Sequence, residues 1–221
     1  MLDARLRECL HCMDGCSVLY DVGSDHAYLP TAAIKEGMIE KAYAVDNKEG
    51  PLDNARVTIE SNEAQASIEL KLSSGLDDLQ DDVDCVSIAG VGGKTIYDIM
   101  RHSDFKAVKR FIFQPSAHPQ KVRQLVNMRA LKITRESVVA LKGELYPIIV
   151  MERGTQTLDD TDLYIGPILR HSPPEIYKRH LADEHAFLST LIDSIPSEDA
   201  KVPLKEKKQL LERVFDEWQS N

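Results

Sequence analysis

Two carboxylates, a histidine and a tyrosine lie close together in one short segment, residues 21–30, which reads DVGSDHAYLP. An apolar run, residues 18–20, leads into Asp21, and a helix-compatible run, residues 31–35, follows Pro30. A strand, a tight glycine-containing turn and a helix, in that order, bring backbone groups and carboxylates against a nucleotide-like ligand. The segment therefore predicts a ligand site at the end of the first strand.

The acidic residues of this turn indicate the kind of ligand. Only Gly23 of a dinucleotide-binding fingerprint is present, and Asp25 occupies the second glycine position. Two acidic side chains would repel a pyrophosphate. They suit a ligand that carries hydroxyls, an ammonium or a sulfonium, so we predict S-adenosylmethionine rather than NAD.

Further ligand groups are expected after the next strands, because ligands of open parallel sheets bind beyond the carboxyl ends of the strands. Asp46 ends a predicted strand at 42–45, and a carboxylate there can accept both ribose hydroxyls. Taken alone, Asp46 would rather be a helix or loop cap. Gly75 and Leu76 follow a strand at 68–72 and are expected beside the adenine. The predicted cofactor contacts are Asp21, Gly23, Ser24, Asp25, Asp46, Asn47, Gly75, Leu76, Ala89 and Gly90.

The glycine-rich segment 88–93, IAGVGG, ends the fourth predicted strand at 83–89. Methyltransferases that act on the amine of adenine usually hold an acidic or amide residue, two prolines and an aromatic here, and this chain does not. Three glycines allow close approach of the backbone to a substrate, although such a cluster by itself is more often a turn. The segment indicates that the accepted base is not attacked at its exocyclic amine, and Gly92 is a predicted substrate contact.

The order of the predicted elements defines a fold class. An amphipathic helix at 2–13 precedes five strand–helix units, whose strands lie at 18–22, 42–45, 68–72, 83–89 and 110–114. Two further strands, 131–141 and 144–152, are joined only by Lys142-Gly143, which is too short for a helical crossover. We therefore predict an α/β fold with a Rossmann-like class I methyltransferase sheet closed by an antiparallel hairpin.

The last part of the chain has a different pattern. A polar linker begins at 154, Ser172-Pro173-Pro174 starts a helix, and a second helix follows the segment 196–203. Apolar residues repeat at heptad steps in both, which predicts an antiparallel, coiled-coil-like helical hairpin. We expect a methyltransferase domain at 1–155 and a helical domain at 156–221.

Charge is unevenly distributed in this acidic chain of net charge -9. Residues 94–142 hold 11 Lys or Arg against three acids, whereas residues 77–84 hold five acids and no base. Such segregation is expected if one region meets phosphates, although ordinary solvated helix faces explain it equally well. Lys121 and Arg123 are the predicted RNA contacts.

The cysteine spacing and the hydropathy pattern indicate whether the protein binds a metal or spans a membrane. Cys9, Cys12 and Cys16 follow helical spacing beside His11, but the chain has no second cysteine pair at zinc-ligand spacing. We expect buried reduced thiols and no metal. With no apolar run of about 18 residues and no signal-peptide pattern, we expect a cytoplasmic protein without a membrane span. A monomer is expected, and the sequence leaves a dimer open.

The segment DVGSDHAYLP also resembles the opening motif of the bacterial tRNA adenine-22 N1-methyltransferase family. Further pieces match in order: Gly50-Pro51, Asn54-Ala55, Ser74-Gly75-Leu76, the segment 88–93, Gln114-Pro115 and Tyr146. The resemblance is good over residues 2–152 and looser beyond. Val91 stands where the family usually has methionine and Ser116 where it usually has asparagine, and neither departure removes a charge.

The resemblance implies methylation of the ring nitrogen N1 of an adenine in tRNA, at position 22. N1 is already nucleophilic at neutral pH, so the site has to position the base and tolerate positive charge on it. Asp25, His26 and Tyr28 are the predicted catalytic residues, although His26 fits a structural hydrogen bond equally well. Gln114 and Pro115 are predicted to contact the target base. Alternatively, they form a turn at the end of the strand.

Two other classes of function compete with this one. A nicotinamide-linked oxidoreductase is disfavoured by the missing glycines and by the terminal hairpin. A non-catalytic RNA-binding protein on a methyltransferase fold is disfavoured because every expected ligand carboxylate is present.

Overall fold

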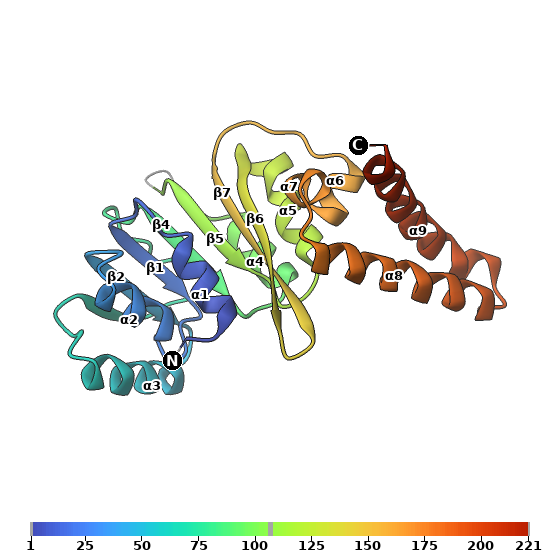
Figure 1. Ribbon diagram of the computed structural model, residues 1–221. Helices are drawn as coiled ribbons and strands as arrows, with labels where there is room; N and C mark the ends of the chain where they lie inside the picture. Colours follow the sequence, from blue (N-terminus) through green and yellow to red (C-terminus); the bar gives the residue numbers. More distant parts are fainter. Residues whose placement is uncertain (1, 106–107, 221) are drawn as a thin grey trace. The chain divides into compact units, whose positions relative to one another are not determined.

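One seven-stranded sheet forms the first part of the molecule in the computed structural model, which describes residues 2–105 and 108–220. The strand order is β3-β2-β1-β4-β5-β7-β6 (Figure 1). The first five strands are parallel, and β7 runs antiparallel to both β5 and β6. The strands are β1 (Val18–Val22), β2 (Lys41–Asp46), β3 (Ile68–Leu72), β4 (Cys85–Ala89), β5 (Arg110–Gln114), β6 (Leu131–Leu141) and β7 (Glu144–Arg153). The predicted Rossmann-like methyltransferase sheet closed by a hairpin is confirmed.

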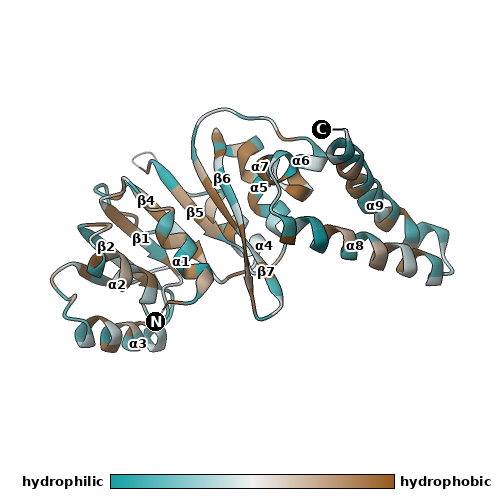
Figure 2. Ribbon diagram, viewed as in Figure 1, coloured by the Kyte–Doolittle hydropathy of each residue, from teal (hydrophilic) through white to brown (hydrophobic). Residues whose placement is uncertain are grey.

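Helices cover both faces of this sheet. They are α1 (Ala4–His11), α2 (Tyr28–Lys35), α3 (Glu49–Ser61), α4 (Gly93–Met100) and α5 (Pro119–Arg129). Helices α1, α2 and α3 lie on one face and α4 and α5 on the other (Figure 1). Strands covered on both sides read as continuous apolar runs, and β1, β4 and β5 are largely hydrophobic in Figure 2.

The first helix is shorter than the predicted span 2–13 because Asp3 caps it. The Asp3 carboxylate accepts the backbone N–H groups of Arg5 and Leu6, each at 3.0 Å. Since α1 ends at His11, the predicted helical face shared by three cysteines is wrong: Cys12 caps the helix and Cys16 lies beyond it. All four cysteines are free and buried. No group of three or more His, Cys, Asp or Glu in the described ranges is arranged to hold a metal.

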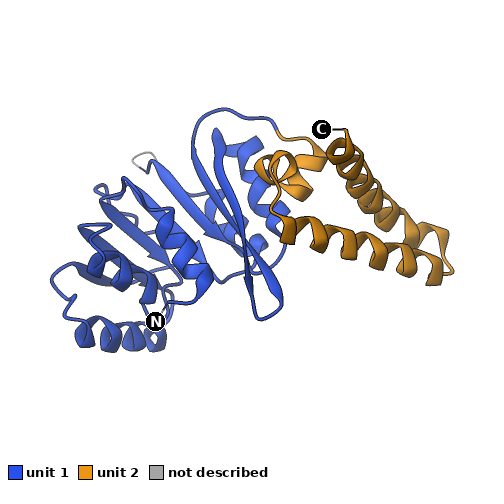
Figure 3. Ribbon diagram, in the orientation of Figure 1, with its two compact units in different colours: residues 1–157 blue, residues 158–221 orange. Residues whose placement is uncertain are grey.

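The chain divides into two compact units, residues 1–157 and 158–221 (Figure 3). The second unit contains α6 (Asp160–Ile165), α7 (Pro167–His171), α8 (Glu175–Ser194) and α9 (Glu198–Gln219). Tyr177, Leu181 and Leu188 of α8 are buried, as are Leu211 and Val214 of α9. None of the helices in the described residues is long and apolar enough to cross a membrane.

Two parts of the second unit differ from prediction. The span 160–171, predicted as linker, holds α6 and α7, which are too short to show a helical period. Helix α9 begins at Glu198 rather than after Pro203, because the Ser197 hydroxyl caps its N-terminus. Pro203 then lies in the second turn and is exposed, where water can satisfy the carbonyl that loses its partner.

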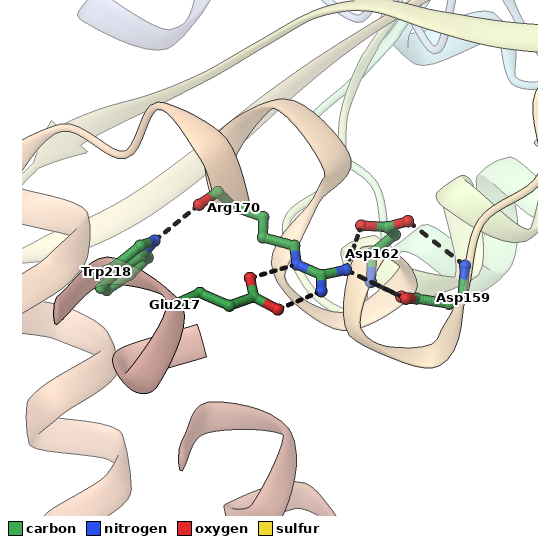
Figure 4. Close-up of polar contacts among 5 residues, drawn as sticks. All are labelled: Asp159, Asp162, Arg170, Glu217 and Trp218. Atoms are coloured by element: carbon green, nitrogen blue, oxygen red, sulfur yellow. Dashed lines mark hydrogen bonds and ion pairs between the residues drawn. The ribbon is translucent and has the colours of Figure 1, made fainter. Parts of the chain in front are cut away.

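Arg170 joins the short helices of the second unit to the end of α9 (Figure 4). Its guanidinium makes a two-point contact with Glu217, with Nε 2.8 Å from Oε2, and Nη1 lies 3.0 Å from Asp162 and 3.1 Å from Asp159. The indole N–H of Trp218 donates to the Arg170 carbonyl at 2.7 Å. Hydrogen bonding to Arg170 lowers the pKa of the Glu217 carboxyl. This cluster fixes α6 and α7 against α9 within the unit.

Candidate cofactor and substrate site

The turn after β1 is held in a strained backbone conformation. Gly23, Asp25 and Ala27 have φ values of 71°, 48° and 51°, a left-handed region that side chains other than glycine rarely occupy. The backbone N–H groups of Gly23 and Ser24 donate to the Val45 carbonyl of β2, at 2.8 and 3.0 Å. The turn is thus fixed against β2 with Asp25 exposed at its centre.

Asp21 lies buried in the wall of a cavity of about 390 Å³ at the end of β1, the Asp21 cavity. Its carboxylate accepts hydrogen bonds from the Ser24 hydroxyl, at 2.6 Å, and from the Ser87 hydroxyl. Burial raises the pKa of the Asp21 carboxyl to about 6, although both hydroxyls act to lower it. The lining residues are Asp3, Arg5, Leu6, Asp21, Gly23, Ser24, Asp25, His26, Tyr28, Leu29, Ala89, Gly90 and Val91.

A second cavity of about 410 Å³, the Asp46 cavity, opens at the end of β2. Gly23, Asp25 and Val91 line both cavities, so the two adjoin across the turn after β1. The remaining lining residues are Val22, Asp46, Asn47, Lys48, Pro51, Ser73, Ser74, Gly75, Ile88, Thr95 and Ile99. The carboxylates at the ends of β1 and β2 therefore face neighbouring compartments of one trough.

The turn after β3 closes the Asp46 cavity. Gly75 has a φ of 57°, and a Cβ there would lie 3.0 Å from Cγ2 of Ile99. Glycine thus permits the close approach of this turn to α4. Leu76 is buried and lines a third cavity of about 390 Å³, which shares Ser74, Gly75, Thr95 and Ile99 with the Asp46 cavity.

His26 and Tyr28 form a stacked pair in the wall of the Asp21 cavity. Their ring centroids lie 5.1 Å apart with an angle of 11° between the planes. Tyr28 is 48% exposed, which is unusual for a large aromatic residue and leaves ring surface free for contact. His26 Nε2 lies 3.7 Å from a carboxylate oxygen of Asp25, so the three predicted catalytic residues are together.

Arg5 lies in the wall of the Asp21 cavity, although no motif or spacing in the sequence points to it. Its guanidinium donates to the side chain of Gln114 at 2.9 Å and to Asp3 at 2.7 Å. It also lies over the ring of Tyr146, 5.0 Å from the centroid. A fixed guanidinium is suited to a carboxylate, so Arg5 complements the acidic residues of the cavity.

The predicted contact of Gln114 and Pro115 with a base is corrected by the structure. Both residues are buried, and Gln114 is fully so. The Gln114 side chain accepts from Arg5 and from the backbone N–H of Gly90, and donates to the Pro115 carbonyl. Its polar atoms therefore position the site wall. Gly92 is half-buried at the N-cap of α4 and is not among the lining residues of the two adjoining cavities.

The RNA contact predicted for Arg123 is also wrong. Its side chain is fully buried, and Nε lies 2.8 Å from a carboxylate oxygen of the equally buried Glu136. In contrast, Lys121 is exposed on α5 and remains available. Two other basic residues of the span 94–142 form ion pairs within the protein, Arg110 with Glu152 and Arg135 with Glu8. Lys106, counted in that span, lies outside the described residues.

Comparisons with known proteins agree with this geometry. The family model described as TrmK, tRNA (adenine(22)-N(1))-methyltransferase, matches residues 19–217. The chain belongs to the TrmK family. It is 25% identical to the tRNA (adenine(22)-N(1))-methyltransferase of Bacillus subtilis, and the match covers 97% of each chain.

Solved structures share the TrmK fold over nearly the whole chain. A Streptococcus pneumoniae protein crystallised with S-adenosyl-L-methionine is 28% identical, with a TM-score of 0.89 over 97% of this chain and 99% of that one. The structure of Bacillus subtilis TrmK is similar in fold, with 22% identity, a TM-score of 0.88 and coverage of 97% and 98%.

The donor set of the two cavities fits the family cofactor, S-adenosylmethionine. The cofactor has a ribose with two hydroxyls and an amino-acid end carrying an ammonium and a carboxylate. Asp46 supplies a carboxylate in one cavity, and Asp21 and Arg5 supply groups of opposite charge in the other. This TrmK-family chain is an S-adenosylmethionine-dependent methyltransferase.

Proposed function

We propose that this chain transfers a methyl group from S-adenosylmethionine to N1 of an adenine in tRNA, adenine 22. The observation that carries the proposal is the trough formed by the Asp21 and Asp46 cavities, which puts carboxylates from two strand ends on either side of one strained turn. The family description supplies the target atom and position. S-adenosylmethionine, when bound, supplies an electrophilic methyl group on a sulfonium.

The residues on the cofactor side of the trough bind S-adenosylmethionine and orient it. We assign the ribose hydroxyls to Asp46, whose carboxylate can accept two hydrogen bonds at once. Asn47 and Gly75 line the same cavity and Leu76 lies in the adjoining one, so this end suits the adenosine. Asp21, Gly23, Ser24, Ala89 and Gly90 line the other cavity with Arg5, which suits the amino-acid end.

On the substrate side, the base is assigned to the mouth of the Asp21 cavity. The exposed ring of Tyr28, backed by His26, offers a stacking surface for adenine. The Asp25 carboxylate can accept a hydrogen bond from the adenine amine and offset the positive charge that methylation places on the ring. Since N1 carries its own lone pair, the residues have to hold it in line with the methyl group and exclude water.

Methylation of defined transcripts tests this function. The protein is incubated with labelled S-adenosylmethionine and an unmodified tRNA transcript, and the nucleosides are separated after digestion. We expect 1-methyladenosine, and its loss when adenine 22 alone is replaced by guanine. Label in N6-methyladenosine, or no label in any tRNA, would contradict the proposal.

The helical unit is proposed to orient the tRNA, as a second point of contact in addition to the catalytic domain. A second attachment raises the effective concentration of substrate at the site without new chemistry. Residues 158–221 hold eight Lys or Arg against thirteen Asp or Glu, so general charge attraction would not drive this contact. Shielding of an apolar flank of the sheet, or dimerisation, are the competing roles. RNA binding, a monomeric state and a cytoplasmic location complete the proposal.

A further inference from the structure

Two loops beside the Asp21 cavity are joined by three backbone hydrogen bonds. Gly90 N–H donates to the Gln114 carbonyl at 3.0 Å, Ser116 N–H to Val91 at 2.9 Å, and Gly93 N–H to Ala117 at 2.7 Å. These joined loops, residues 90–93 and 114–118, lead into α4 and α5. A Cβ at Gly93 would lie 2.2 Å from the His118 carbonyl oxygen, so only glycine permits the contact. The result is a fixed surface next to the cavity.

Exposed lysines follow each of the joined loops. Lys94 lies in the first turn of α4 and Lys121 in the first turn of α5, and both are exposed. Neither forms an ion pair with any residue in the described ranges, and the Lys121 ammonium donates a hydrogen bond to the side-chain amide oxygen of Gln124 at 3.3 Å. Both charges therefore remain available to an outside partner, and both helix N-termini add positive potential at the same place.

The position of these two lysines distinguishes them from others in the basic span. Ala89 pairs with Gln114, so both loops leave the carboxyl end of the parallel strands, where the cavities open. Lys109 and Lys132 are also exposed but lie at the opposite end of the strands. Lys109 directly precedes Arg110, which lies opposite the first residue of β4 in the sheet. Lys132 lies opposite Glu152 of β7, and Glu152 in turn lies opposite Arg110.

The acidic trough explains why phosphates would stay outside it. Asp21, Asp25 and Asp46 line the two cavities and repel a phosphodiester, while a neutral base can enter. A nucleic acid bound at this site must therefore keep its backbone at the rim. Gly90 and Val91 of the joined loops line the Asp21 cavity, and Lys94 and Lys121 follow these loops in the first turns of α4 and α5.

We infer that the joined loops, with Lys94 and Lys121, hold the phosphodiester backbone of the RNA next to the nucleotide that enters the Asp21 cavity. The inference rests on the proposed function, because it assumes an RNA substrate for this site. It assigns the lysines a positioning role through phosphates and no part in reading the sequence.

Paired charge reversals test the inference. One variant carries Lys94→Glu with Lys121→Glu, and the matched control carries Lys109→Glu with Lys132→Glu. Glutamate in the first turn of a helix is favourable, so the test variant should fold. Binding of S-adenosylmethionine should be unchanged in both variants. The test variant should bind tRNA at least about tenfold more weakly at 0.15 M salt, with a log–log salt slope smaller by about 1.5 to 2, as two lost contacts predict.

Wild-type tRNA affinity in the test variant, or equal weakening in both variants, would overturn the inference. Failure of the proposed function would look different: the wild-type protein would methylate no tRNA. Fluorescence titration of the same variants with unmethylated tRNA would still decide whether the joined loops bind RNA.

Discussion

Gln114 accepts a hydrogen bond from Arg5 at 2.9 Å between Oε1 and Nη1, although 109 positions separate the two residues. The same amide oxygen accepts the backbone N–H of Gly90 at 3.2 Å. The end of β5 thereby fixes both the first helix and the turn after β4 at the wall of the Asp21 cavity. A cation is placed opposite the acidic residues of the site by contacts that involve three distant parts of the chain.

Replacement of Arg5 by alanine should weaken binding of S-adenosylmethionine about 10- to 100-fold. A charge-assisted hydrogen bond to the cofactor carboxylate contributes about 1.5 to 3 kcal/mol, which this change removes. Calorimetric titration with S-adenosylmethionine measures this loss of affinity. Arg7→Ala is the matched control, since Arg7 lies on the same helix and pairs with Glu36 outside the cavities. Equal affinities for the two variants would disprove the role of Arg5.

Asp46→Ala should also weaken cofactor binding, by about 2 to 3 kcal/mol, because it removes a charged acceptor for two ribose hydroxyls. Asp53→Ala serves as the control. Asp53 is exposed on α3, where it pairs only with Arg56 among the ion pairs of the described residues. An unchanged dissociation constant for Asp46→Ala would refute the ribose assignment.

The raised pKa of Asp21 predicts a pH-dependent stability. Well below pH 4, at about pH 3 and under, the carboxyl is neutral in both states. Between about pH 4 and 6 it ionises in the unfolded chain but stays protonated in the folded one, so stability falls as pH rises. The loss approaches about 3 kcal/mol by pH 6, at about 1.4 kcal/mol per unit.

Asp21→Asn removes this titration. Urea denaturation of both proteins from pH 4 to 7 should show the wild type losing stability relative to the variant, with most of the change complete by pH 6. Asp53→Asn, which alters an exposed carboxylate, should track the wild type at every pH. A stability difference between wild type and Asp21→Asn that does not vary with pH would contradict the prediction.

The sheet and the carboxylate-bearing strand ends could be predicted because each rests on local patterns. Strand–turn–helix order places Asp21 and Asp46 at one edge of a parallel sheet whatever the rest of the chain does. Arg5 could not be predicted, since its approach to Gln114 depends on how α1 packs across the sheet. Arg123 was misassigned because a count of charges does not reveal burial.

Arg123 is expected to affect stability. Replacing it by methionine leaves the buried Glu136 carboxylate without its cation, which typically costs about 3 to 5 kcal/mol. Chemical denaturation measures the loss. Adding Glu136→Leu should recover much of it, because two apolar side chains replace the pair. A variant with wild-type stability and weakened tRNA binding would restore Arg123 as an RNA contact.

The helical unit is expected to be dispensable for cofactor binding but needed for tRNA methylation. The predicted cofactor contacts and the residues that line the Asp21 and Asp46 cavities all lie within residues 1–157. A chain that ends at Thr157 should therefore fold and bind S-adenosylmethionine with wild-type affinity, since these residues form a compact unit with its own core.

The same truncation should lower tRNA methylation at subsaturating tRNA at least about tenfold, because a second attachment point raises effective concentration by large factors. Calorimetry measures the affinity of the truncated chain for S-adenosylmethionine, and methyl incorporation measures its rate of tRNA methylation. Full-length Arg170→Ala is an independent variant, because it breaks the cluster that joins α6 and α7 to α9 and leaves unit 1 unaltered. It should lower tRNA methylation without changing cofactor affinity. A truncated protein that methylates tRNA at the full-length rate would refute the orienting role, and one that aggregates would favour shielding of the sheet.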